Sequence, residues 1–362
     1  MRTAGNAALG ASEARRSPKP LTVLALAAVG VLVLSVLWFF VIPTGSSQVR
    51  LVDIATGTPV IRIAHDLKEA GIIRSETCFM ALARLTHLSV KAGEYGFKRV
   101  NLIRVLRTLS LGRVHLHRIL VREGDSIARI AVLLGSEHLA DPARFRRATV
   151  NKRILLNLGV PADSAEGYLF PDTYLIPRNM GEERILALMV RRFFEKLPRN
   201  LAARAEKRGM SLHRAVTFAS IVEREARVPA ERVLISAVFH NRLRRGMPLQ
   251  ADPTVLYALG RWDEKLAIKD LLIDHPYNTY RRKGLPPGPI CSPGLACLIA
   301  AVEPAQADYL YFVTRKDGSG RHEFSKTLKA HENAIKKSKE RVRVGKTAAK
   351  EAAVTPDSSR RP

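Results

Sequence analysis

Two glutamates, Glu223 and Glu225, lie inside an apolar, helix-forming run that covers residues 211–228. An ionised carboxylate is costly to bury among apolar side chains, so such surroundings favour the protonated form. A polar segment of the kind that hydrogen-bonds a hydroxyl-rich ligand follows at residues 240–254. A protonated carboxyl beside a polar groove is what acid catalysis on a sugar requires.

Helical spacing places the two glutamates on different parts of this predicted helix. Glu223 follows Ala219 by four residues and falls on the apolar stripe, whereas Glu225 falls on its flank. Residues two apart on a helix do not face each other, so we expect one carboxyl to act and the other to be structural. Spacing alone does not choose between them. The competing interpretation is a glutamate held in a salt bridge by a neighbouring arginine such as Arg224.

An uncharged segment near the N-terminus, residues 21–43, predicts a transmembrane helix. At the rise of an α-helix, residues 21–42 extend roughly 33 Å, enough to cross a bilayer core of about 30 Å. The basic segment 1–20 precedes it, so the positive-inside rule predicts a single-pass protein of the cell inner membrane with a cytoplasmic N-terminus and a periplasmic catalytic part. A cleaved signal peptide is the alternative, but residues 42–45 form no obvious cleavage site.

The formal net charge of +26 is densest in the last segment, residues 336–362, which we predict to be a disordered basic tail. A basic chain attracts nucleic acid, but a membrane anchor that exports the basic part favours anionic lipid or cell-wall polymer instead. We therefore expect no nucleic-acid partner.

The chain has three cysteines, of which Cys291 and Cys297 could pair in an oxidising compartment. The histidines are scattered, and neither a Cys-x-x-Cys nor a His-Glu-x-x-His motif is present. We expect neither a metal nor a cofactor.

The region 50–150 holds a diverged internal repeat, in which residues 57–64 match residues 124–131. In both copies a short β-prone run leads into a glycine turn and an amphipathic helix. This arrangement resembles the LysM module, a small glycan-binding fold, although a generic βα unit with a capped helix fits equally well. With helices and short strands predicted across 151–335, the expected fold class is α+β, and the expected domains are a LysM-like unit and a catalytic unit.

Five ordered motifs carry a resemblance to a known family. They are Glu166–Tyr174, Ala219–Ala226, Val238–Leu243, Leu249–Thr254 and Tyr277–Ile290. In this order they resemble the motifs of the endolytic murein transglycosylases, the YceG-like family, over about residues 50–335.

The resemblance implies that Glu225 is the catalytic acid and that the substrate is a nascent peptidoglycan strand. The reaction implied is cleavage between N-acetylmuramic acid and N-acetylglucosamine to leave a 1,6-anhydro end, which stops strand elongation. Synthases of the cell wall are implied partners. The residues expected to bind the glycan are Glu166, Asn241, Gln250, Asp252, Tyr277, Asn278, Tyr280 and Ser292. Each taken alone is more often a structural hydrogen-bonding residue, and a non-catalytic wall-binding scaffold is the competing function.

Overall fold

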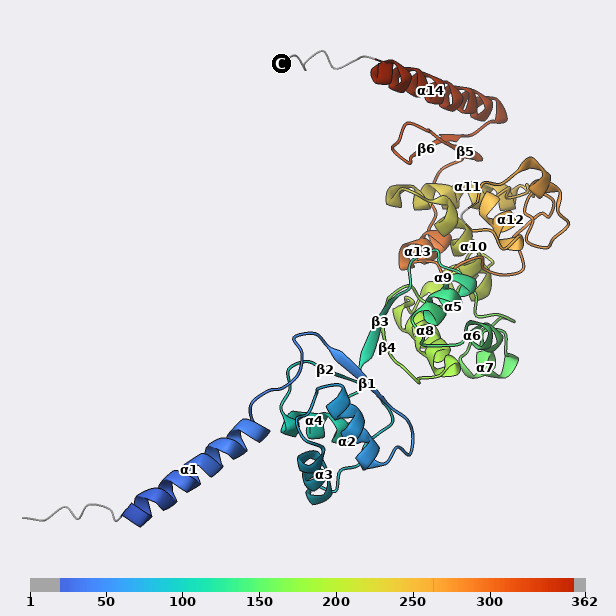
Figure 1. Ribbon diagram of the computed structural model, residues 1–362. Coiled ribbons are helices and arrows are strands. Elements are labelled where there is room, and N and C mark those ends of the chain that lie inside the picture. The colour runs from blue at the N-terminus through green and yellow to red at the C-terminus, as the bar shows by residue number, and fades with distance from the viewer. Residues whose placement is uncertain (1–19, 263, 355–362) are drawn as a thin grey trace, which may run out of the picture. The chain divides into compact units, whose positions relative to one another are not determined.

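A computed structural model describes residues 20–262 and 264–354. The chain divides between His115 and Leu116 into two compact units (Figure 1).

The first unit packs three short helices against a two-stranded sheet. Its elements are α1 (Pro20–Phe40), β1 (Arg50–Ile54), α2 (Val60–Glu69), α3 (Glu76–Leu85), β2 (Gly93–Phe97) and α4 (Leu102–Ser110). Strand β1 runs antiparallel to β2, with Val52 opposite Tyr95. A core that includes Leu67, Phe79 and Leu109, all fully buried, holds the helices to the sheet.

Helix α1 covers most of the uncharged N-terminal segment. Across the residues that the structure describes, none of the helices meets both the length and the apolarity needed for a membrane crossing. The structure therefore does not confirm the span predicted at 21–43, and most of the basic segment 1–20 lies outside the described residues.

The second unit is built mainly from helices, with two antiparallel strand pairs. Its first half contains β3 (Leu116–Leu120), α5 (Ile127–Ser136), α6 (Pro142–Ala148), α7 (Lys152–Asn157), β4 (Thr173–Pro177), α8 (Glu182–Lys196) and α9 (Leu201–Glu206). Its second half contains α10 (Leu212–Glu225), a 3-10 turn (Pro229–Glu231), α11 (Arg232–Arg244), α12 (Asp252–Ala258), a 3-10 turn (Ile268–Leu272), α13 (Leu295–Val302), β5 (Tyr311–Thr314), β6 (His322–Ser325) and α14 (Leu328–Val354). The mixture of helices and small sheets confirms the predicted α+β class.

The division between the units differs from the predicted boundary at residue 150. Strand β3 pairs with β4, with Ile119 opposite Tyr174, and α6 packs against α8. These contacts join residues 116–150 to the second unit. The two copies of the repeat do each form a strand followed by a helix, β1–α2 and β3–α5, but they lie in different units. Their likeness to a LysM module stays a prediction.

Helix α10 lies in the core of the second unit. Ser211 caps its first turn by accepting a hydrogen bond from the backbone N–H of Arg214 at 3.3 Å. The apolar residues between Ala215 and Val222 are at most 1% exposed, and the helix packs against α9, α11, α12 and α13. Burial of each large apolar side chain contributes about 1.5–3 kcal/mol. The helix ends at Glu225, three residues before the predicted end at 228, because Ala226 adopts an extended conformation.

The C-terminal segment also differs from its prediction. Helix α14 continues to Val354, through most of the segment predicted to be disordered. Ala334 and Ser338 on this helix are 2% exposed, and the Ser338 hydroxyl donates to the carbonyl of Thr314 at the end of β5 at 2.8 Å. Packing on the β5–β6 hairpin therefore stabilises the start of a helix whose charge alone suggested a solvated tail. Residues 355–362 lie outside the described part of the chain.

Gly167, in the first motif, lies in a tightly packed part of the second unit. Gly167 has φ +85°, and a Cβ there would lie 2.6 Å from Pro289 and 2.9 Å from Val216. Gly159 has φ +72°, but a Cβ there would meet nothing within 4 Å. Gly159→Ala should therefore cost about 1 kcal/mol of unfolding free energy from backbone strain, and Gly167→Ala a further ~1–3 kcal/mol from overpacking.

Urea denaturation of the two glycine variants and the wild type measures both costs. Equal destabilisation by the two substitutions would show that the contact of Gly167 with Pro289 is not tight in solution.

Candidate active site

Glu225 lies at the C-terminal end of α10 and lines a pocket of about 330 Å³. The Glu225 pocket, as we call it, is formed by α10, α11, the start of α12, the β5–β6 hairpin and α14. Its other lining residues are Arg242, Leu249, Gln250, Asp252, Tyr280, Phe312, Val313, Thr314, His322 and His331.

The surroundings of Glu225 favour its neutral form. Burial, reinforced by the negative charge of Asp252, raises the pKa of Glu225 to about 8, against the opposing charges of Arg224, Arg227 and Arg242. The negative end of the α10 dipole also disfavours a carboxylate at this position. Among the described residues no arginine forms an ion pair with Glu225, so the salt-bridge interpretation does not hold for this side chain.

Two of the sequence motifs meet at the pocket wall. The backbone N–H of Gln250 donates to the carbonyl of Thr279 at 3.1 Å, and that of Ala251 donates to the Thr279 hydroxyl at 3.0 Å. These bonds hold Gln250 in a left-handed conformation, φ 52°. They also bring Tyr280 to Asp252, whose carboxylate accepts a hydrogen bond from the Tyr280 hydroxyl. Residues far apart in the sequence thus form one polar wall beside Glu225.

Arg242 organises this wall but was not among the predicted site residues. Its side chain is buried and donates from Nε to the carbonyl of Leu310 at 2.7 Å. Its Nη1 donates to the carbonyl of Leu249 at 2.8 Å and to Oε1 of Gln250 at 3.2 Å. The sequence signal was present, because Arg242 lies in the third motif, but only the fold shows that its guanidinium reaches the pocket.

A histidine and a glutamate form a second feature that the sequence did not reveal. Nδ1 of His322 lies 2.7 Å from Oε2 of Glu231, and the backbone N–H of His322 donates to both oxygens of that carboxylate. A carboxylate can only accept, so the ring donates from Nδ1. This bond fixes the orientation of a histidine that lines the Glu225 pocket.

Glu166 and Tyr277 both lie beside Tyr257 of α12, and neither of them lines the Glu225 pocket. Glu166 is 4% exposed and accepts a hydrogen bond from the backbone N–H of Ile127, at the start of α5, at 3.2 Å. The Tyr257 hydroxyl lies 3.4 Å from its Oε2, and the Tyr277 ring lies 4.9 Å from that of Tyr257. Burial raises the pKa of Glu166 to about 8. This carboxyl connects α5 to α12.

Three further predicted site residues stabilise loops. Asn241 donates to the carbonyls of Ala307 at 2.7 Å and Tyr309 at 2.9 Å. Asn278 donates to the carbonyls of Leu271 and Ile273 and accepts from the backbone N–H of Tyr280. Ser292 is the third of these residues.

Ser292 is fully buried, and its backbone bonds to Gly124 at 2.9 Å and to Asp125 at 2.8 Å. Its hydroxyl has no hydrogen-bond partner within the described chain. Of the eight predicted binding residues, the structure therefore brings Gln250, Asp252 and Tyr280 to Glu225.

The other glutamate of α10 has a structural contact. Oε2 of Glu223 accepts a hydrogen bond from the backbone N–H of Gly294 at 2.8 Å, which holds the loop before α13 against α10. Cys291 and Cys297 lie nearby, both buried and both free, so the pairing considered from the sequence does not occur in this structure. Within the described ranges, no group of His, Cys, Asp and Glu side chains is arranged to hold a metal ion.

Comparisons with known proteins agree with this architecture. A profile of the YceG-like family matches residues 52–337. The chain belongs to the YceG-like family. This YceG-like protein is 35% identical over 309 residues to the endolytic murein transglycosylase of Bacillus subtilis strain 168, with 79% of this chain and 84% of that relative covered.

Two further relatives extend the comparison. The endolytic murein transglycosylase of Streptococcus pneumoniae serotype 2 is 29% identical, with 75% of this YceG-like chain and 55% of that longer protein covered. A crystal structure of a yceG-like protein from Listeria monocytogenes matches with a TM-score of 0.56 at 30% identity, covering 80% of this chain and 99% of that one.

The buried carboxyl of Glu166 makes the stability of the protein depend on pH. Its pKa is raised from 4.5 to about 8 on folding, so the unfolded state ionises first as the pH rises between these values. The free energy of unfolding should therefore fall across this window, by about 1.4 kcal/mol per pKa unit, or a few kcal/mol in all. Glu166→Gln removes this contribution and should gain stability relative to the wild type from pH 5 to pH 8.

Urea denaturation at both pH values measures the difference, and Glu206→Gln, at an exposed site, is the control. A difference between Glu166→Gln and the wild type that does not change with pH would contradict a protonated, buried Glu166.

Proposed function

We propose that this chain is an endolytic lytic transglycosylase that cleaves peptidoglycan strands, with Glu225 as its catalytic acid. The observation that carries the proposal is a desolvated carboxyl, neutral near pH 7, in a polar pocket of a YceG-like fold. The names of two relatives, both endolytic murein transglycosylases, support the substrate class.

The proposed reaction needs one carboxyl that acts twice. Glu225 donates its proton to the glycosidic oxygen between N-acetylmuramic acid and N-acetylglucosamine as the bond from that oxygen to C1 breaks. The 6-hydroxyl of the same muramyl residue forms the new bond to C1, and the ionised Glu225 accepts the proton of that hydroxyl. The products are a 1,6-anhydro end and a free hydroxyl on the other sugar, and no water is consumed.

The charges around Glu225 suit both steps. Asp252 and burial favour the acid before the first step, and the positive charges of Arg224, Arg227 and Arg242 favour the carboxylate between the two steps. Gln250, Tyr280 and His322 line the same pocket and offer hydrogen-bonding groups to the sugar hydroxyls and acetamido groups.

We also propose that the protein acts at the cell inner membrane, anchored through residues 21–43 with its catalytic unit in the periplasm. The support for this location is the absence of charge from that segment and the basic residues before it. Glycan binding by the LysM-like βα units, release of nascent strands and contact with peptidoglycan synthases belong to the same proposal.

Glu225→Gln tests the catalytic assignment, since glutamine keeps the shape of the side chain but cannot supply the proton. Release of anhydro-ended fragments from peptidoglycan, measured by mass spectrometry, should fall by at least ~100-fold. Glu206→Gln should leave it unchanged.

Wild-type product release by Glu225→Gln would show that another group is the acid. No product from any of the proteins would instead favour a non-catalytic scaffold that only binds the wall.

Asp252→Asn should move the pH dependence of the reaction. The negative charge of Asp252 helps to raise the pKa of Glu225 to about 8, so its removal should lower that pKa. Because the acid must be protonated, the loss of kcat/KM at rising pH should begin at a lower pH than in the wild type. A pH–rate profile measures this shift, and an unchanged alkaline limb would contradict a coupling between the two carboxyls.

A further inference from the structure

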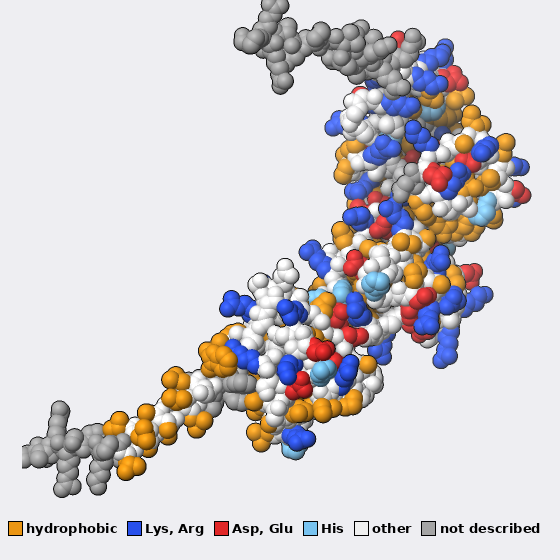
Figure 2. Space-filling model, viewed as in Figure 1, with side chains coloured by type: hydrophobic (Ala, Val, Ile, Leu, Met, Phe, Trp, Pro, Cys, Tyr) orange, Lys and Arg blue, Asp and Glu red, His pale blue; other side chains and the backbone are white. Residues whose placement is uncertain are grey.

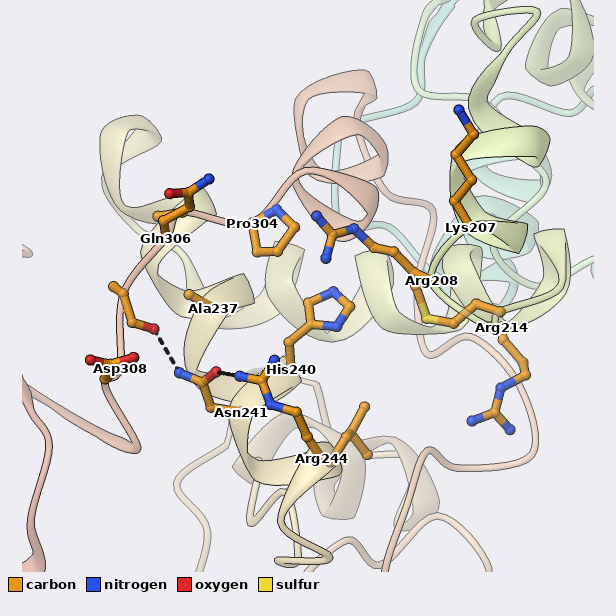
Figure 3. Close-up of a pocket in the computed structure, with 15 residues that line it drawn as sticks. Lys207, Arg208, Arg214, Ala237, His240, Asn241, Arg244, Pro304, Gln306 and Asp308 are labelled. Carbon is orange, nitrogen blue, oxygen red and sulfur yellow. Dashed lines mark hydrogen bonds between the residues drawn. The ribbon is translucent and has the colours of Figure 1, made fainter.

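A second pocket in the catalytic unit carries mainly positive charge. It has a volume of about 680 Å³ and lies between the α9–α10 connection, α11 and the segment after α13 (Figure 3). Four cationic side chains line this basic pocket, namely those of Lys207, Arg208, Arg214 and Arg244, and the only carboxylate among its lining residues is that of Asp308. Asp308 is 79% exposed and is paired with Lys326.

In the part of the chain that the structure describes, other arginines of this unit form ion pairs with carboxylates, whereas the cations of the basic pocket do not. Arg192 lies 2.7 Å from Asp172, and Arg261 lies 2.6 Å from Asp270. On the face shown in Figure 2, Lys and Arg side chains are mixed with Asp and Glu. By contrast, Lys207 and Arg214 have no side-chain partner within the described chain. Positive charge that no carboxylate offsets would stabilise a bound anion here.

The pocket also offers a hydrogen-bond acceptor. Nε2 of His240 lies 2.8 Å from the carbonyl of Ala301, so this nitrogen carries the proton of that bond. Burial and the charges of Arg208 and Arg244 lower the pKa of His240, which keeps the ring neutral and leaves Nδ1 as an acceptor. Figure 3 shows the Arg208 guanidinium and the His240 ring directed toward the same space. A ligand that fits has an anionic group next to an N–H or O–H donor.

We propose that the basic pocket binds the C-terminal carboxylate of a peptide, with the N–H of the last peptide bond directed to His240. The inference rests on the proposed function, because peptidoglycan carries short peptides with free carboxylates on its muramyl residues. The ligand is then the peptide stem of a strand whose glycan lies in the Glu225 pocket.

The two pockets border the same helix, α11. They lie on opposite sides of α11, since Arg242 lines the Glu225 pocket while Asn241 and Arg244 line the basic pocket. A helix with its side chains is about 10–12 Å across. A stem of four residues extends roughly 13–14 Å. Arg242 and Arg244 belong to the last turn of α11, so the stem can pass around the end of the helix.

Peptide binding tests this inference without requiring turnover. The full chain carrying Glu225→Gln is titrated with the tetrapeptide L-Ala-D-Glu-L-Lys-D-Ala, with the same peptide amidated at its C-terminus, and with inorganic phosphate. The free acid should bind about tenfold more tightly than the amide, as expected for a charge-assisted hydrogen bond. Phosphate should compete only weakly because it lacks the neighbouring N–H.

Substitutions of the residues that line the basic pocket test whether the peptide binds there. Arg244 is exposed, and its guanidinium donates to Oδ1 of Asn241. Arg244→Gln should weaken binding of the free acid about tenfold, and Arg208→Gln should do the same. His240→Phe, which keeps a ring against Phe218 but removes the acceptor, should weaken binding of the acid and the amide alike. Arg199→Gln, an exposed arginine outside the pocket, is the charge-matched control and should bind like its parent.

Equal affinity for acid and amide, or equal losses in Arg199→Gln and Arg244→Gln, would overturn the inference and indicate only a general attraction to positive charge. Tighter binding of phosphate than of the peptide would overturn the assignment to a carboxylate. The outcome is separable from the proposed function: retained cleavage by Glu225→Gln would remove the catalytic assignment while leaving the peptide measurements intact.

Discussion

The Glu225 pocket is organised around one carboxyl, that of Glu225, which is kept out of water at the end of a buried helix. The apolar residues of α10 anchor this helix in the core, so the position of its last residue is fixed by packing rather than by a loop. Burial and a second carboxylate favour the proton, while three arginines prevent its pKa from rising further. This balance places the pKa near neutrality, where a group can both donate and accept a proton.

The polar residues around Glu225 divide into those that face the pocket and those that build it. Arg242 binds backbone carbonyls from two different loops, and Asn278 shapes the loop that presents Tyr280 to Asp252. Asn241 fixes the chain after α13 in the same way. Many polar residues of the motifs therefore hold loops in place by hydrogen bonds to backbone carbonyls. This explains why each motif contains more polar residues than those that line the pocket.

The sequence was sufficient to predict the α10 helix and the fold class, because apolar periodicity is a local property. The choice of Glu225 over Glu223 came from the family resemblance, and its catalytic role stays a prediction. The sequence could not assign residues 116–150 to the second unit, since that depends on the pairing of β3 with β4 across more than fifty residues. It also missed His322, whose role follows from a contact with Glu231 at a sequence separation of 91 residues. Residues 336–354 were predicted to be disordered because their charge is visible in the sequence, whereas the packing of α14 on the β5–β6 hairpin is not.

The β5–β6 hairpin and the first turn of α14 supply His322 and His331 to the wall opposite Glu225. His322 and His331 follow Glu225 by 97 and 106 residues in the sequence, so a pocket that begins on α10 is completed by segments far downstream of it. A polypeptide interrupted by incomplete translation or by proteolysis before His331 would contain the acid but lack a closed site around it.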